Sequence, residues 1–240
     1  MNNFNHNRYV AHFDMLGFKN AVIRNPNEAW GALSDFNQCM EELLNSTVII
    51  SSFNKSISDR IQTKIFSDTV LIHSLSDETD DLISIIVLIS RFFFNSLKKC
   101  VPIRGAITYG EFFFNPHKNL YLGIPWIKAH EMGESAQWNG IIVQDEVANR
   151  FKNLPANIFE AKDMIIKWDV IFKKSNKLSK ENVNVINWPA MVKNYNFRIP
   201  IKVTDYYQAF ESLFGPYDNL SDDIKNKYIN TTDFINANLR

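Results

Sequence analysis

Two aspartates, Asp14 and Asp68, each interrupt an apolar segment beside an expected tight turn. Asp14 follows the apolar run 9–13, and Asp68 lies inside the apolar stretch 65–72. A carboxylate in apolar surroundings loses hydration, and a folded chain tolerates this only where positive charge compensates. On neighbouring strands the two carboxylates would repel each other unless divalent cations lay between them. The pattern therefore favours hard metal ions held by oxygen ligands, and with them phosphate chemistry.

The composition argues against several classes of partner. The 240 residues are 45% hydrophobic, which suits one sizeable domain, and Lys+Arg and Asp+Glu both number 26. Without a basic excess, no nucleic-acid partner is expected. Cys39 and Cys100 have no metal-ligand spacing, so we interpret them as reduced thiols of a cytoplasmic protein. The polar segment 1–8 is unlike a signal peptide.

The most apolar stretch, residues 82–94, predicts a buried helix and no membrane partner. It is shorter than the roughly 20 residues that cross a bilayer, and Arg91 interrupts it. Its apolar residues recur at helical spacing, which indicates one face packed against a core.

Hydrophobic periodicity predicts an alternation of strands and helices up to residue 151. The expected strands are 8–14, 59–67, 69–74, 101–109, 112–114 and 141–143, and the expected helices are 17–45 (broken near Pro26), 78–99, 124–137 and 145–151. This order favours an α+β fold with a split βαβ sheet. The first strand then lies centrally beside the hairpin of strands 59–67 and 69–74. Asp14 and Asp68 become neighbours in space, with Asp68 at the hairpin tip.

The character of the sequence changes after Pro155. Residues 173–184 are polar and lysine-rich and predict a loop, 185–188 an edge strand, and 205–214 and 222–238 surface helices. We therefore expect a main domain over residues 1–153. Residues 154–240 are expected to form a C-terminal α/β extension packed on the same domain.

Four segments, in order, resemble class III nucleotide cyclases. Residues 13–18 (Phe-Asp-Met-Leu-Gly-Phe) resemble the first metal motif, and 64–68 (Lys-Ile-Phe-Ser-Asp) the second, with Ser67 where the family usually has Gly. Residues 104–111 resemble the strand after the long helix, and 123–143 the later helix and strand. The resemblance covers about 9–151. It implies a ferredoxin-like cyclase catalytic domain with a βααββαβ core.

Two details look closer to one branch of the family. Phe-Ser-Asp-Thr at 66–69 and Gly-x-Pro-x-x-x-Ala at 123–129 resemble the bacterial pyrimidine cyclases of Pycsar antiphage systems. This implies a lyase that converts UTP or CTP to cyclic UMP or cyclic CMP plus diphosphate. It also implies a homodimer, whose sites are built from two chains, and an effector that responds to the cyclic nucleotide. The sequence leaves UTP and CTP open.

The resemblance also implies the roles of individual residues. Asp14 and Asp68 are the expected catalytic residues and would bridge two Mn²⁺ or Mg²⁺ ions, with the backbone carbonyl of Met15 as a further ligand. The expected substrate-binding residues are Phe13, Leu16, Gly17, Phe18, Lys64, Ile65, Phe66 and Ser67. Among these, the N–H groups of the 16–18 turn would face the phosphates. Phe13 or Phe66 would pack on ribose or base, and Lys64 would lie near the base.

Some positions depart from the family pattern. Ile127 and Glu131 align where purine-specific relatives carry an Asn and an Arg that steady the transferring phosphate, and Leu120 aligns with the acidic partner of the base-reading lysine. Adenine readout by a Lys–Asp pair is therefore not expected. Two alternatives stay open: a purine-type (adenylate) cyclase, and a catalytically silent domain that binds nucleotide. A diguanylate-type enzyme lacks support because no Gly-Gly-Asp/Glu hairpin is present at Ser67-Asp68.

Ordinary structural roles also fit the key residues. Asp14 could cap the following helix and Asp68 could be a turn residue. Lys64 could be a solvated strand lysine, and Arg104 is expected to pair with a structural carboxylate such as Glu111.

Overall fold

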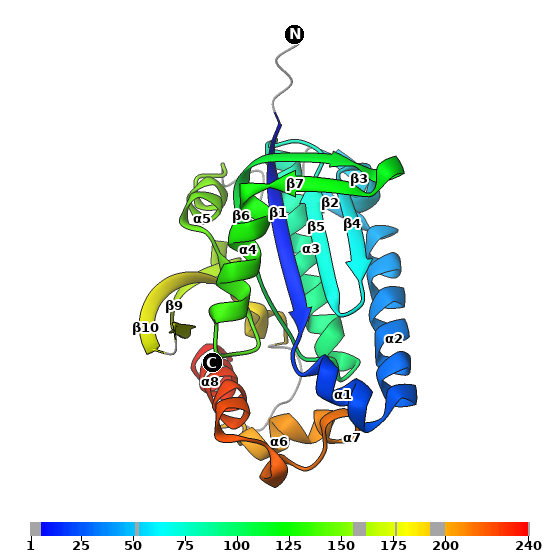
Figure 1. Ribbon diagram of the computed structural model, residues 1–240. Coiled ribbons are helices and arrows are strands. Elements are labelled where there is room, and N and C mark those ends of the chain that lie inside the picture. Colours follow the sequence, from blue (N-terminus) through cyan, green and yellow to red (C-terminus); the bar gives the residue numbers. More distant parts are fainter. Residues whose placement is uncertain (1–5, 51–52, 156–161, 176, 193–199, 240) are drawn as a thin grey trace.

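The protein is described by a computed structural model that covers residues 6–50, 53–155, 162–175, 177–192 and 200–239. Its centre is a mixed sheet with strand order β4-β5-β1-β6-β8-β10-β9, and β7 pairs with β6 alongside (Figure 1). Strand β1 (Asn7–Met15) lies between β5 (Thr69–Ser74) and β6 (Ile103–Asn115) and is antiparallel to both. The predicted central position of the first strand is confirmed.

The remaining elements largely follow the predicted order. The other strands are β2 (Thr47–Ile50), β3 (Phe53–Ser56), β4 (Ile61–Phe66), β7 (Leu120–Gly123), β8 (Ile141–Val143), β9 (Ile165–Lys174) and β10 (Lys177–Ile186). The helices are α1 (Phe18–Arg24), α2 (Pro26–Leu44), α3 (Thr79–Lys98), α4 (Ile124–Ser135), α5 (Asp145–Lys152), α6 (Val203–Tyr207), α7 (Glu211–Phe214) and α8 (Asp222–Asn238). The strands expected at 101–109 and 112–114 are one strand, β6. The helix expected at 205–214 is divided into α6 and α7.

The two faces of the sheet carry different helices. Side chains alternate along β1, so Phe13 faces α3, where its ring centroid lies 5.7 Å from that of Phe92. His12 faces the other way, and its ring centroid lies 4.7 Å from that of His130 on α4. Helices α2 and α3 therefore cover one face and α4 covers part of the other (Figure 1).

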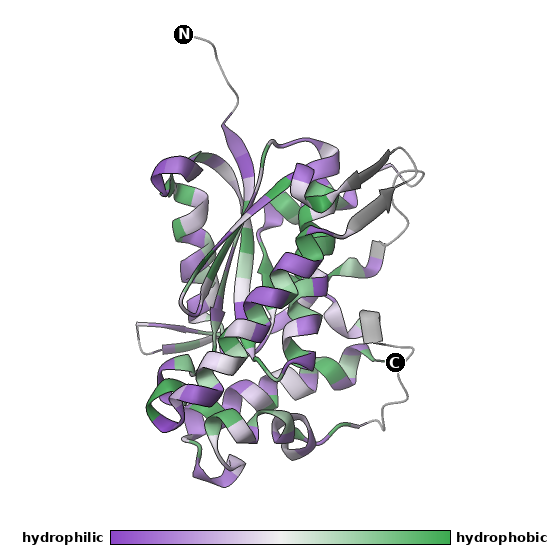
Figure 2. Ribbon diagram, turned by 90° about the vertical axis from the view of Figure 1, so that its right-hand side faces the viewer, coloured by the Kyte–Doolittle hydropathy of each residue, from purple (hydrophilic) through white to green (hydrophobic). Residues whose placement is uncertain are grey.

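Helix α3 is buried between the sheet and α2, as the apolar pattern predicts. Its buried side chains include Leu82, Ile85, Ile86, Ile89, Phe92 and Phe93. Burying each of these contributes roughly 1.5–3 kcal/mol, so α3 supplies much of the core. Purple and green alternate around the outer helices, which reflects one polar and one apolar face (Figure 2). None of the helices described here has the length and apolar character needed to cross a membrane.

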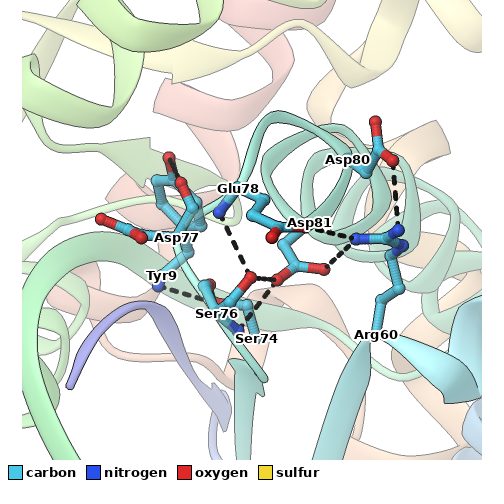
Figure 3. Close-up of polar contacts among 8 residues, drawn as sticks. All are labelled: Tyr9, Arg60, Ser74, Ser76, Asp77, Glu78, Asp80 and Asp81. Atoms are coloured by element: carbon cyan, nitrogen blue, oxygen red, sulfur yellow. Dashed lines mark hydrogen bonds and ion pairs between the residues drawn. The ribbon is translucent and has the colours of Figure 1, made fainter. Parts of the chain in front are cut away.

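A polar cluster ties the start of α3 to the sheet (Figure 3). Buried Asp81 accepts hydrogen bonds from the Ser76 backbone N–H (2.8 Å) and from Arg60 (3.1 Å). The Ser74 hydroxyl accepts from the Tyr9 N–H at 2.9 Å. The cluster lies near the first residues of β1, whereas Asp14 lies near the last, so it is separate from the predicted site and anchors α3.

The predicted lysine-rich loop at 173–184 is wrong. Residues 173–174 end strand β9 and residues 177–184 form most of strand β10, which pairs with β9, and β9 is the edge strand instead of 185–188. The lysines there suit an edge strand, because Lys174 and Lys180 pair with Glu181 and Asp169 across the hairpin. Since β10 pairs with β8, residues after 154 continue the same sheet. The domain boundary at residue 153 stays a prediction.

Candidate active site

Asp14 and Asp68 lie beside each other at one end of the sheet. Asp68 is the second residue of the two-residue turn between β4 and β5, and its backbone carbonyl accepts a hydrogen bond from the Met15 N–H at 3.1 Å. Asp14 lies directly opposite Thr69 in the β1–β5 ladder. The hairpin tip therefore brings the two aspartates together, although they are distant in sequence.

Arg104 compensates the charge of Asp14. The β1–β6 register places Arg104 opposite Asp14, and its Nη2 lies 3.4 Å from Asp14 Oδ2. The Arg104 side chain is 10% exposed and the Asp14 side chain 31%. Burial raises the pKa of Asp14, Arg104 opposes this, and the charge of Asp68 raises the pKa further. The expected pairing of Arg104 with a carboxylate such as Glu111 is replaced by a pairing with Asp14.

The two carboxylates fit divalent metal ions that a substrate helps to hold. Within the described residues, no group of three or more His, Cys, Asp or Glu side chains is placed to bind a metal. Mg²⁺ is commonly bound through one or two carboxylates together with substrate phosphates, so a pair is a sufficient donor set. Both aspartates are partly exposed, which leaves their oxygens accessible.

Two further predicted residues share the face of Asp14. In the β4–β5–β1 ladders, Phe66 lies opposite Thr69, which lies opposite Asp14, and Lys64 lies two residues away on the same face. The Lys64 ammonium lies 5.8 Å from the centre of the Phe66 ring, which is 41% exposed. The contacts of Lys64 and Phe66 with a substrate stay predictions.

Phe13 and Ile65 point to the opposite face. Phe13 is fully buried against α3, and Ile65 packs against the same core. The expectation that Phe13 packs on ribose or base is therefore wrong for its side chain, and the Ile65 side chain is also directed away. The physical reason is that successive side chains of a strand point to opposite faces. Because Asp14 and Lys64 face the site, their neighbours Phe13 and Ile65 must face the core.

The turn between β1 and α1 is only partly available to a ligand. The Leu16 N–H donates to the Pro102 carbonyl at 2.9 Å, so it cannot also donate to a phosphate, and the Phe18 side chain is buried. Gly17 is the exposed N-cap residue of α1 with φ 76°, a left-handed conformation that favours glycine. The N–H groups of Gly17 and Phe18 begin the helix and have no intrahelical acceptor by helix geometry.

The remaining predicted positions lie in the β4–β5 hairpin turn and on α4. Ser67 adopts φ 54° as the first residue of the hairpin turn, where a glycine would be unstrained. Ile127 and Glu131 are exposed on α4. The inner side of α4 instead offers the Glu134 carbonyl, which accepts from Arg104 Nη1 at 2.5 Å.

The sequence did not predict that the C-terminal helices reach this end of the sheet. A pocket of about 150 Å³ is lined by the Leu16-Gly17 turn together with residues of α7 and α8, among them Phe214 and Lys227. Helix α8 reads as an ordinary surface helix in sequence, and no local signal marks Lys227 as a site residue.

Comparisons with known proteins identify the fold. No family model and no curated protein matches this sequence. The chain is similar in structure to the adenylyl cyclase CyaB from P. aeruginosa, with a TM-score of 0.50, 12% identity, and coverage of 82% of this chain and 97% of that one. It is also similar to a bacterial light-regulated adenylyl cyclase, with a TM-score of 0.51, 11% identity, and coverage of 87% and 56%. The fold is that of a class III cyclase catalytic domain. At these identities the likeness concerns the fold alone.

Proposed function

We propose that the chain is a nucleotide cyclase that converts UTP or CTP to its 3′,5′-cyclic monophosphate and diphosphate. The observation that carries the proposal is the convergence of Asp14 and Asp68 at one end of a sheet with the class III cyclase fold. Like charges on these neighbouring carboxylates repel, and divalent cations between them would relieve that repulsion. A domain that only bound nucleotide would have no need of both.

Each site residue would have a distinct role in the proposed reaction. Asp14 and Asp68, with the Met15 backbone carbonyl, would hold two Mn²⁺ or Mg²⁺ ions, which when bound lower the pKa of the ribose 3′-hydroxyl and neutralise the phosphates. The ribose 3′-hydroxyl gives up its proton to solvent, its oxygen forms a bond to the α-phosphorus, the bond from the α-phosphorus to the bridging oxygen breaks, and diphosphate leaves. The chain positions the 3′-oxygen, the α-phosphorus and the leaving diphosphate in line, and Arg104 favours the ionised form of the half-buried Asp14 carboxylate.

The choice of a pyrimidine base rests on the resemblance and on one departure. Leu120, which aligns with the acidic partner of the base-reading lysine, is exposed on β7 and has no acid to offer. Lys64 and Phe66 are then the candidates for base contact on the sheet face. The role in antiphage defence, with an effector that responds to the product, rests on the resemblance alone.

A homodimer is supported by an apolar surface, and its head-to-tail arrangement rests on the resemblance. The exposed large apolar side chains on β6, β7 and the first turn of α4 are Phe113, Leu120, Leu122, Ile124 and Ile127. Phe113 and Leu122 lie opposite each other in the β6–β7 ladder, so they share a face. Exposed apolar residues that share a face are typical of contact surfaces.

The direct test incubates the full chain with ATP, GTP, CTP and UTP separately, in the presence of Mn²⁺, and identifies the products by mass. We expect a cyclic product from UTP or CTP. A cyclic product from ATP alone would support the purine-type cyclase. Absence of product from all four, together with triphosphate binding that does not depend on Mn²⁺ or Mg²⁺, would support the silent domain, which the exposed Ile127 and Glu131 favour.

A further inference from the structure

The C-terminal helices close the end of the candidate active site within the same chain. In Figure 1, α6, α7 and α8 lie at the lower end of the molecule, where β1 ends and α1 begins. The Phe214 ring of α7 lies 3.2 Å from the position that a Cβ of Gly17 would occupy. The pocket of about 150 Å³ lies at this contact, with Leu16 and Gly17 among its lining residues and Lys227 contributed by α8.

Lys227 is a largely buried cation with little compensation. Its side chain is 16% exposed, and burial lowers its pKa, with the positive charge of Arg104 lowering it further. Asp223 lies 3.7 Å from the Lys227 ammonium. The same carboxylate is itself half-exposed and lies closer, at 2.9 Å, to the ammonium of Lys173. Asp223 is therefore shared, and the positive charge of Lys227 next to the pocket is only partly compensated.

Arg104 places a second cation at the same end of the sheet. Its guanidinium contacts Asp14 and the Glu134 carbonyl, while its Nε is buried and has no hydrogen-bond partner among the described residues. The charge of Arg104 lowers the pKa of Lys227, so the two cations repel, and an anion between or beside them removes that cost. The Asp14 end of the sheet thus offers carboxylates for metal ions and, beside them, positive charge for phosphate oxygens.

We propose that Lys227 is a substrate-binding residue whose ammonium contacts the β- or γ-phosphate of the nucleoside triphosphate. The C-terminal extension then supplies in the same chain a cation for the leaving phosphates, a role distinct from that of the α4 positions Ile127 and Glu131. This inference rests on the proposed function, because it assigns a triphosphate to the site. A lysine suits the role, since its ammonium is a compact charge on a flexible stem that binds phosphate as a point charge.

The alternative role of Lys227 is structural, as the partner of Asp223 in an ion pair. The two roles differ in what Asp223→Asn does. If the ion pair is what matters, D223N and K227Q lose the same contact and have the same effect. If Lys227 binds phosphate, D223N leaves the cation in place with less compensation, and phosphate binding is retained or strengthened.

The experiment measures binding of inorganic tripolyphosphate to the full chain by calorimetry in the presence of Mn²⁺, with melting temperatures for every variant. We expect Lys227→Gln to weaken binding roughly ten- to hundredfold, the loss of one charge-assisted hydrogen bond, and Lys227→Arg to restore most of it. Lys225→Gln removes the same charge from the same helix away from the pocket and is expected to leave binding unchanged. Equal binding by K227Q and the unaltered chain, or equal losses in K227Q and D223N, would overturn the inference.

Kinetics separate this inference from the proposed function. With the preferred triphosphate, K227Q is expected to raise KM more than it lowers kcat, because the contact lies on the leaving diphosphate. If the chain forms cyclic nucleotide and K227Q has unchanged KM and kcat, the proposed function stands and the role of Lys227 fails. If tripolyphosphate binding depends on Lys227 but no triphosphate is cyclised, the phosphate site stands and the cyclase proposal fails.

Discussion

The guanidinium of Arg104 lies across the β1–β6 ladder from the carboxylate of Asp14, with Nη2 3.4 Å from Oδ2. This pair favours the ionised form of the candidate metal ligand. Burial and Asp68 both raise the pKa of Asp14, and Arg104 is the group that opposes them. A carboxylate must be ionised to bind metal, and the cation on the neighbouring strand favours that form against the effect of burial.

Replacing Arg104 should move the acid limb of the activity profile. In Arg104→Gln, the charge of Arg104 no longer lowers the pKa of Asp14, so this pKa rises further and Asp14 becomes protonated at a higher pH. We expect the acid limb of kcat/KM against pH to shift upwards, and Arg104→Lys to restore it in part. The measurement is a pH–rate profile with the metal ion in excess, alongside the melting temperature. An unchanged acid limb in a folded R104Q protein would show that Arg104 does not control Asp14.

Replacing Asp14 with asparagine is expected to lower activity without lowering stability. Asn resembles the protonated form of Asp, and the folded state favours that form of Asp14 because its pKa is raised. At pH 7, Asp14→Asn is therefore expected to leave the metal-free protein at least as stable. Its cyclase activity should fall roughly a thousandfold or more, since several kcal/mol of charge stabilisation by the metal ions is lost.

Asp68→Asn is expected to lose activity to a similar extent, because both carboxylates are needed to hold the ions. The exposed Asp59→Asn provides a matched change at the other end of β4, where activity should be unaffected. Melting temperatures and product formation from the preferred triphosphate measure both effects. Turnover close to that of the unaltered chain in either D14N or D68N would refute the assignment of the site.

The hairpin turn that carries Asp68 should tolerate glycine. Ser67 has φ 54°, and a residue with a Cβ is strained there by roughly 1 kcal/mol compared with glycine. Ser67→Gly is therefore expected to raise the free energy of unfolding by up to about 1 kcal/mol, after the entropy of the unfolded chain is counted. Ser67→Ala keeps the Cβ and should change little. Denaturant unfolding of both variants measures the difference, and a destabilised S67G would show that the Ser67 side chain holds the turn.

Parts of this architecture could be predicted from sequence because they depend on local periodicity. The hairpin at 61–74 and the buried helix α3 follow from short-range patterns, and together they place Asp68 beside Asp14. The same period-two rule, applied to Phe13, also indicates that its side chain must face the core when Asp14 faces the site. The expected contact of the Phe13 side chain with a substrate is therefore inconsistent with this rule.

Other parts depend on contacts between segments that are distant in sequence. The β9–β10 hairpin is rich in lysine and looks like a loop, because its charged residues are satisfied only by cross-strand partners such as Lys174 and Glu181. In sequence, Lys227 resembles an ordinary surface lysine, and only the packing of α8 beside the turn at Gly17 places it at a pocket. Likewise, nothing in the sequence near Leu16 indicates that its N–H donates a hydrogen bond to the Pro102 carbonyl.

Stability should fall in acid partly because of His73. This residue of β5 is buried, its ring centroid lies 4.3 Å from that of Phe114, and burial lowers its pKa to about 4. Between about pH 6.5 and pH 4 the unfolded chain binds a proton at this position and the folded chain does not, so stability decreases as the pH falls. The lowered pKa corresponds to about 3 kcal/mol at most across this range.

Replacing the buried histidine with an apolar residue of similar size should remove its part of this slope. We expect His73→Phe to lose less stability than the unaltered chain between pH 7 and pH 4.5, in denaturant unfolding at each pH. A slope remains, because the pKa of His12 is also lowered to about 4, by burial first and by the charges of His130 and Arg104. His117→Gln, at an exposed position, is the matched control and should leave the slope unchanged. A slope in H73F equal to that of H117Q would show that His73 is not the buried neutral group described here.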